Sequence, residues 1–319
     1  MEVETGTVVK ASRWTLRRWS RWLGAAAVMG ATAGAALAGA DSRPTAEESE
    51  TLAAPASGAL RLENFVGEIE VVAVEGATEV KAEVLKRGQG RSQKEAEEAL
   101  DEISVSLSPD AMSPGTLVAR ATLPNKLFNW GGDNKQHEVQ WRVTAPPSVV
   151  LKITNDVGDV TVKGFTAGAH LATDVGDIVA EGIINGVQAS SHVGDIEVSA
   201  SGAITARSDT GSVSVTVLDG PTGSVTASSD VGSVTVTLSD AWAGDVDINT
   251  DVGSIQSGVA SFEPDGRQSD HRMRGAIGGG GEHRLKVSTD VGGVILRQGN
   301  ADIHRHRGSR NEDRRKRPL

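Results

Sequence analysis

A three-residue phrase of Asp or His, then Val or Thr, then Gly recurs seven times between residue 155 and the end of the chain. Its glycines are 18, 18, 17, 21, 21 and 39 residues apart, and a near-constant period of this length is typical of stacked repeats. The repeat says more about the architecture than about the function, because the recurring residues are ones that form turns and pack in a core. The glycines of the phrase are Gly158, Gly176, Gly194, Gly211, Gly232, Gly253 and Gly292.

Apolar residues alternate with polar ones on both sides of each phrase, as in Leu151 and Ile153 before Gly158 and Val160 and Val162 after it. This period of two predicts two strands per repeat, each with one apolar face. A type II turn between them needs positive φ at its third residue, which favours glycine. The seven glycines are therefore predicted to be structural turn residues, and the Asp before each is expected to accept a backbone N–H at its own corner.

One repeat cannot bury its apolar face alone, whereas stacked repeats share a continuous core. Strands of successive repeats would then run parallel, and parallel crossovers are right-handed in nearly all proteins. The sequence therefore predicts an all-β fold, a right-handed parallel β-solenoid (β-helix) of about eight coils. Residues 59–76 repeat the same register and are predicted to form the first coil, while residues 151–299 form the others.

The segments outside the coils have a different character. Residues 41–58 are rich in Glu, Ser, Ala and Pro and are expected to form a flexible linker. Within residues 77–150, Ser92 and Glu95 form a capping box that predicts a short helix to about Leu100, and alternating strands follow. We expect a small β-rich subdomain, inserted after the first coil and packed on the N-terminal end of the solenoid, where it covers an exposed edge.

A second excursion separates Gly253 from Gly292. It contains the glycine run 278–281 but lacks the lysine and following Ser or Thr of a phosphate-binding P-loop. Residues 258–284 are therefore expected to form a mobile insertion between coils, the kind of segment that often carries function.

The first forty residues have the order of a secretory signal peptide: a basic region, an apolar run and Ala38-Gly39-Ala40 before Asp41. A retained membrane anchor is the alternative, disfavoured because the apolar run is short and rich in Ala and Gly for a spanning helix. Arg17-Arg18 suggests twin-arginine export, whereas the residues after it depart from that motif, so both export routes stay open. We expect an exported protein, periplasmic, cell-surface or extracellular, with no integral membrane segment after signal cleavage.

Composition and charge exclude several classes of site and partner. The chain has no cysteine, which rules out disulfides, a thiol nucleophile and a lipidated cysteine. Its formal charge of −10 combines +3 on residues 1–40 and +4 on residues 300–319, which leaves −17 on the body between them. Such a body repels nucleic acid and favours basic partners or divalent cations.

The C-terminal residues 300–319 are predicted to form a basic disordered tail, solvated or in contact with an anionic envelope polymer. His304 and His306 are two neighbouring imidazoles in this tail, which is too little for a metal site.

The order of these features resembles the bacterial putative-adhesin family of β-solenoid domains. The features are the rung from Leu60 to Val71, the helix-bearing excursion ending in Pro146-Pro147, the Asp-Val-Gly coils and the glycine-rich loop before Asp290. The resemblance covers about residues 58–299. It implies an exported or envelope-associated protein with no established enzymatic activity and no catalytic residues to carry over.

Parallel β-helices also include polysaccharide lyases and hydrolases, which need acids set against Lys or Arg and aromatic platforms for sugars. Between residues 155 and 260 the only basic side chains are Lys163 and Arg207, and the only aromatic ones are Phe165 and Trp242. We therefore expect no enzyme but a non-catalytic envelope scaffold or adhesion-like binding module with an unknown envelope or surface ligand. A carbohydrate-active β-helix enzyme is the alternative.

Stacked coils would align acidic residues into columns. Asp156 would lie beside Asp174, and Asp209, Asp230 and Asp251 beside one another, while a second column contains Asp159, Asp177 and Asp195. Carboxylates this close repel one another. We expect backbone N–H groups to offset the repulsion, with no metal and no cofactor, because the Gly-Gly-x-Gly-x-Asp repeat of calcium-binding solenoids is absent. Divalent cations held between the coils are the alternative.

The signal-peptide hypothesis predicts the mature N-terminus. If Ala38-Gly39-Ala40 is a signal-peptidase site, protein purified from its native host begins at Asp41. Intact-mass spectrometry measures this directly. A mass that includes the arginine-rich segment would instead indicate a retained anchor.

Overall fold

The computed structural model describes residues 43–123, 135–219 and 223–299, and within these ranges the chain forms one helix and two sheets. The predicted signal peptide and basic tail lie outside the described residues. The eleven-stranded sheet contains, in spatial order, β1 (Thr45–Pro55), β4 (Glu79–Gln89), β7 (Gln136–Ala145), β3 (Ile69–Ala73), β9 (Val160–Lys163), β11 (Ile178–Ile183), β13 (Ile196–Ala200), β15 (Val213–Val217), β17 (Val234–Leu238), β23 (Val294–Gln298) and β19 (Ile255–Ser257).

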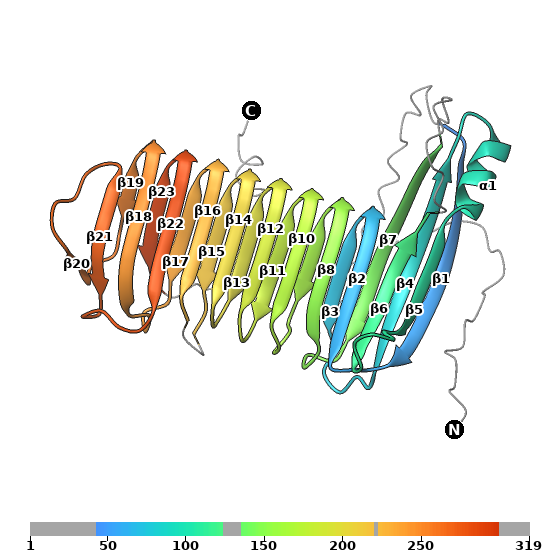
Figure 1. Ribbon diagram of the computed structural model, residues 1–319, viewed down its shortest axis with the longest axis horizontal. Coiled ribbons are helices and arrows are strands. Elements are labelled where there is room, and N and C mark those ends of the chain that lie inside the picture. Colours follow the sequence, from blue (N-terminus) through green and yellow to red (C-terminus); the bar gives the residue numbers. More distant parts are fainter. Residues whose placement is uncertain (1–42, 124–134, 220–222, 300–319) are drawn as a thin grey trace, which may run out of the picture.

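The second sheet has twelve strands and lies against the first (Figure 1). It contains, in spatial order, β20 (Phe262–Pro264), β21 (Arg272–Ile277), β18 (Gly244–Val252), β22 (Arg284–Val291), β16 (Val225–Val231), β14 (Ile204–Thr210), β12 (Val187–Val193), β10 (Ala169–Val175), β8 (Val150–Val157), β2 (Ala59–Val66), β6 (Thr116–Thr122) and β5 (Ser104–Pro109).

Eight strand pairs cross from the twelve-stranded sheet to the eleven-stranded one through a corner glycine. Neighbouring pairs run parallel and in register: Leu151 lies opposite Ala169, and Ile178 opposite Ile196. The fold is thus nearly all-β, with two long sheets dominated by parallel pairing. In spatial order the pairs are β2–β3, β8–β9, β10–β11, β12–β13, β14–β15, β16–β17, β22–β23 and β18–β19.

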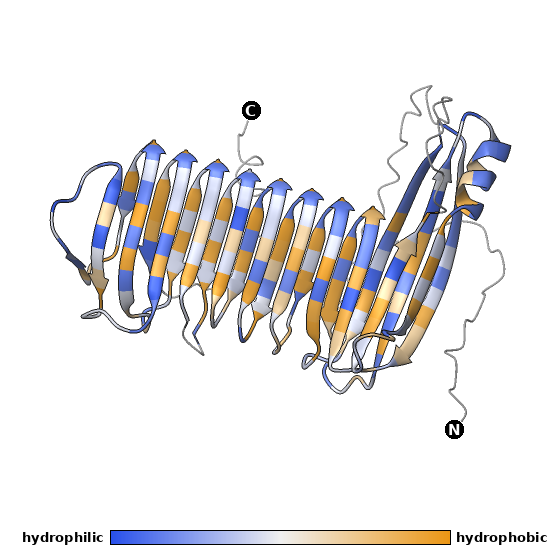
Figure 2. Cartoon of the chain, viewed as in Figure 1, coloured by the Kyte–Doolittle hydropathy of each residue, from blue (hydrophilic) through white to orange (hydrophobic). Residues whose placement is uncertain are grey.

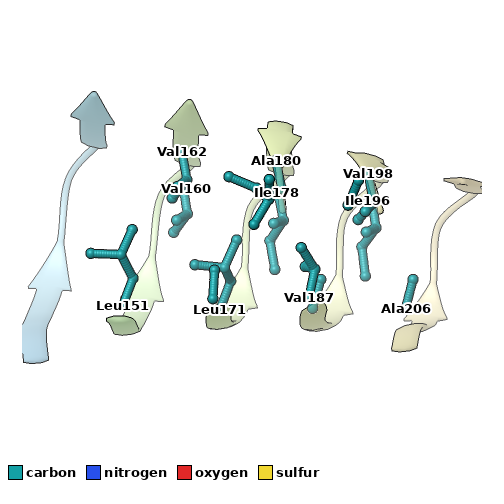
Figure 3. Close-up of a cluster of buried hydrophobic side chains, with 14 of the residues drawn as sticks. Leu151, Val160, Val162, Leu171, Ile178, Ala180, Val187, Ile196, Val198 and Ala206 are labelled. Atoms are coloured by element: carbon teal, nitrogen blue, oxygen red, sulfur yellow. The ribbon is translucent and has the colours of Figure 1, made fainter. Parts of the chain in front are cut away.

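The space between the sheets is filled by one apolar core. The alternation predicted from the sequence is visible along many strands of the stack (Figure 2). Leu151, Val160 and Ile178 are almost fully buried in register with their neighbours (Figure 3). Burying one such side chain contributes about 1.5–3 kcal/mol. The core therefore runs continuously from one pair to the next.

The last pair in the sequence is not the last pair in space. β22 lies between β16 and β18, and β23 lies between β17 and β19. The expectation that Asp230 neighbours Asp251 is therefore wrong, because the pair containing Asp290 separates them. All pairs have the same apolar pattern and the same kind of glycine corner. The β22–β23 pair can therefore pack against a matching strand pair on either side.

The excursion between residues 77 and 150 extends the two sheets and does not form a separately packed subdomain. β4 and β7 continue the eleven-stranded sheet, and β6 and β5 continue the twelve-stranded one. The expected helix is present as α1 (Gln93–Asp101), with the Ser92 hydroxyl accepting the Glu95 N–H at 3.2 Å. It packs on β4 and β1 at one end of the stack (Figure 1).

Two segments expected to be irregular are strands. The linker predicted over residues 41–58 contains β1, which pairs antiparallel with β4 along eleven residues. The insertion predicted over residues 258–284 contains β20 and β21, and β21 pairs antiparallel with β18. Both predictions were wrong because they relied on the polar composition of these segments. A polar segment can still form a strand where the edge of a sheet supplies partners for its backbone hydrogen bonds.

Two constraints act together at the corner glycines. The seven glycines of the phrase have φ between +126° and +158°, which side-chain-bearing residues rarely adopt. A Cβ on Gly176 would also overlap the carbonyl oxygen of Gly158 in the neighbouring pair. The corner therefore needs glycine for its own conformation and for the close approach of the next corner.

Replacing a corner glycine should destabilise two pairs at once. Gly176→Val is expected to lower the free energy of unfolding by about 3 kcal/mol, because it adds both backbone strain and steric overlap. Val179→Thr, on the outward face of β11, is the matched control and should be nearly silent. Urea denaturation compares the two, and equal midpoints would contradict this account of the corner.

Candidate binding surface

A column of buried polar side chains holds successive corners together. The hydroxyl of Ser191, three residues before its corner glycine, donates to the carbonyl oxygen of Gly176 in the adjacent pair at 3.0 Å. The bond recurs from pair to pair at 2.7–3.2 Å, so the carbonyl of each acceptor glycine is paired. The donor–acceptor pairs are Thr173–Gly158, Ser191–Gly176, Ser208–Gly194, Ser229–Gly211, Thr289–Gly232 and Thr250–Gly292.

At the N-terminal end of the column two asparagines replace the hydroxyls. Asn155 donates through Nδ2 to the carbonyl oxygens of Gly67 and Gly158, both at 2.9 Å. Asn64 donates to Val139 of β7 at 3.0 Å and accepts from the indole N–H of Trp141 at 3.3 Å. The sequence interpretation missed this column, although the small polar residue at the third position before each corner glycine was its signal.

The residue before each corner glycine forms an exposed apolar ridge. These valines are 43–62% exposed, and parallel register places them side by side along the stack, interrupted by Thr210 in β14. An exposed apolar stripe of this length is unusual on a soluble surface and marks a contact site more often than a neutral one. We call this set the valine ridge, and it consists of Val157, Val175, Val193, Val231, Val291 and Val252.

Carboxylates flank the valine ridge on both sides. On the glycine side, Asp159 accepts the backbone N–H of Asp177 at 2.9 Å, and Asp177 accepts that of Asp195 at 2.8 Å. The expectation that the Asp before the corner accepts an N–H at its own corner therefore needs correction. Among the described residues, it is the Asp after the corner that accepts a backbone N–H, and the donor belongs to the adjacent strand pair.

The carboxylates before the corner are interleaved with basic groups. The imidazole of His192 lies 3.1 Å from Asp174 and 4.0 Å from Asp209, and Arg207 lies 3.4 Å from Asp209 and 3.7 Å from Asp230. These groups are largely exposed, so each pair contributes little to stability. They do reduce the repulsion expected of an uninterrupted acidic column.

A basin of about 430 Å³ opens at the N-terminal end of this surface, on the outer face of β6, β2 and β8. Its floor holds Glu63 between two arginines, with Arg120 Nε 2.7 Å and Arg61 Nε 3.1 Å from its carboxylate oxygens. The Arg61 contact is an ion pair without hydrogen-bond geometry, since that buried nitrogen has no hydrogen-bond partner. Lys152, Phe65 and Asp156 complete the wall.

Asp156 belongs both to the basin and to the column before the corner. Burial, followed by the negative charge of Asp174, raises the pKa of Asp156 above its ordinary value. A second hollow of about 340 Å³, on the outer face of the other sheet, is lined by four acids, including Glu68, and by Arg142 and the buried Trp141. The basin differs from it because three cations gather there beside the half-buried ring of Phe65.

Within residues 43–123, 135–219 and 223–299, no group of three or more His, Asp or Glu side chains has the arrangement of a metal site. No helix in these ranges is long and apolar enough to span a bilayer. His304 and His306 lie outside the described residues.

Comparison with known proteins gives structural neighbours only. No family model and no curated protein matches the chain. A putative cell adhesion protein from Clostridium sporogenes is 11% identical over 80% of this chain and 100% of its own, with a TM-score of 0.37. A putative adhesin from Bacteroides fragilis is 13% identical over 78% and 97%, with a TM-score of 0.36.

A third neighbour, a putative adhesin from Parabacteroides merdae, is 11% identical over 79% of this chain and 94% of its own, with a TM-score of 0.26. The chain thus resembles solved putative adhesins at low sequence identity, in agreement with the family named from its sequence.

The hydroxyl column can be tested at one position. Ser191→Ala should lower the free energy of unfolding by about 1–2 kcal/mol, because it leaves the Gly176 carbonyl unpaired in a buried site. Ser191→Thr is the matched control, since Thr173 occupies the same position in the adjacent pair, and it should be nearly neutral. If the alanine and threonine variants unfold at the same urea concentration, the bond contributes nothing measurable.

Proposed function

We propose that this protein is a non-catalytic, exported envelope scaffold or adhesion-like binding module built as a right-handed parallel β-solenoid. Residues 59–76 form its first coil, and residues 151–299 form the remaining coils. Residues 77–150 are a β-rich insertion after the first coil that extends both sheets at that end. A cleaved signal peptide precedes them, and a basic tail follows. The mature protein acts in the periplasm, on the cell surface or outside the cell.

The valine ridge is the observation that carries this proposal. Six valines are exposed in one line, although folding does not require valine at this position. Thr210 occupies it in β14, and the strands there still pair in register. Contact with another surface would remove the ridge from water, at about 25 cal/mol for each Å² of apolar area buried. The carboxylates on either side would then discriminate among partners through charge.

Rigidity also supports a binding role. The corner bonds join each pair to the next, so the outer surface has one fixed spacing, and a contact made along it loses little conformational entropy. Catalysis has less support, because the coils between residues 155 and 260 have few of the basic and aromatic side chains that glycan-cleaving sites use, and both aromatic ones, Phe165 and Trp242, are buried.

The binding proposal predicts that the ridge affects binding without affecting stability. Val175→Thr combined with Val193→Thr should reduce binding of the mature protein to an envelope fraction of its native host at least fivefold, with an unchanged melting temperature. The control is Val179→Thr on the outer face of β11, which should bind as the unmodified protein does.

A glycan-array and hydrolysis screen on the same protein tests the alternative, a carbohydrate-active β-helix enzyme. Binding without the release of new sugar ends supports a non-catalytic module. Turnover of any polysaccharide, lost on substitution of a surface carboxylate, would overturn the proposal in favour of the enzyme.

A further inference from the structure

The basin at the N-terminal end of the stack has the composition of a ligand site. Three neighbouring strands contribute side chains in register: β6 contributes Arg120, β2 contributes Glu63 and Phe65, and β8 contributes Lys152. The basin is open to solvent, and its lining combines cations, carboxylates and one aromatic ring. Convergent polar groups beside an apolar surface in a hollow of this size are typical of small-molecule sites.

Phe65 breaks the pattern of its column. Register places it opposite Asp156, at the position where the other strand pairs have Asp or His. Of the five aromatic side chains in the described ranges, Trp141, Phe165 and Trp242 are buried, which leaves Phe65 and Phe262 half-buried. An aromatic ring that lines a hollow offers a flat apolar surface to a ring-shaped ligand.

The charges of the basin leave one cation without a carboxylate. Glu63 compensates the neighbouring guanidinium groups of Arg61 and Arg120, and Asp110 lies 3.3 Å from Arg61. Within the described residues no carboxylate pairs with Lys152, which is exposed at the basin wall. Lys152 can therefore pair with a single negative charge, whereas Glu63, Asp110 and Asp156 would repel a more highly charged group such as a phosphate.

Hydrogen-bonding capacity narrows the ligand further. Glu63, Asp156 and Thr154 supply oxygen acceptors around the remaining space, and acceptors of this kind suit a ligand with several hydroxyl groups. The guanidinium of Arg120 and the ammonium of Lys152 suit a carboxylate. A ring with one carboxylate, several hydroxyls and an apolar face satisfies all of these groups.

We infer that this basin binds a carboxylated sugar, a hexuronate-type residue of an acidic glycan. The sugar carboxylate pairs with Lys152 and Arg120, its hydroxyls donate to Asp156 and Thr154, and its apolar face packs on Phe65. This inference rests on the proposed binding function and gives that function a ligand class.

The test uses the mature protein and two matched oligosaccharides, trigalacturonate and its methyl ester, which lacks the charges. Isothermal titration should show binding of the acid and at least tenfold weaker binding of the ester. Lys152→Thr should weaken binding of the acid at least tenfold. Lys286→Thr is the matched control, because Lys286 has the same register position in β22, far from the basin, and it should leave binding unchanged.

A second variant tests the aromatic contact. Phe65→Asp introduces the residue that most other pairs have at this position, and it should also weaken binding at least tenfold in protein that retains its circular dichroism spectrum. Lys152→Thr provides the test even if Phe65→Asp does not fold.

Three results would overturn the inference: no binding of trigalacturonate at millimolar concentration, equal binding of acid and ester, or binding that survives Lys152→Thr. The experiments also distinguish an error about the ligand site in the basin from an error about the proposed binding function. If Lys152→Thr still binds the host envelope while the double substitution in the valine ridge does not, the module stands and the basin is not its ligand site.

Discussion

The structure depends on how one corner sits against the next. A glycine carbonyl in one strand pair accepts a hydrogen bond from a buried Ser, Thr or Asn in its neighbour, as Gly176 does from Ser191. The same glycine allows the next corner to approach to a distance that a Cβ would forbid. Because parallel strands cannot be joined by tight hairpins, these contacts, and not local turns, hold successive pairs in register.

That constraint determines what the surface can present. Most residues near the corner recur from pair to pair, so the exposed valine becomes a ridge and the aspartates become columns. The charge pattern varies along the stack because His192 and Arg207 lie within one column. A regular interior thus supports an exterior whose chemistry differs from one end to the other, with the basin at the N-terminal end.

The two ends are closed by different means. At one end, α1, β1 and the strands of the excursion extend both sheets, and Val139 of β7 takes the place of a corner carbonyl by accepting from Asn64. At the other, β20 and β21 pair antiparallel beyond β18. Antiparallel strands thus end the twelve-stranded sheet on both sides, whereas the eleven-stranded sheet ends at one side in β19, which pairs in parallel with β23.

The sequence by itself determined the alternation of strands, the glycine corners and the helix capped by Ser92, because these follow from local periodicity and turn chemistry. Only the tertiary structure decided that β22–β23 lies between two earlier pairs, since pairs with the same pattern are interchangeable neighbours. It also decided that the polar residues 45–55 form β1, and that Arg61, Arg120, Lys152 and Phe65 share one basin. The three strands that contain these residues, β2, β6 and β8, are distant in the chain. Pairing between strands brings them together, and a period-2 pattern does not specify which strands pair.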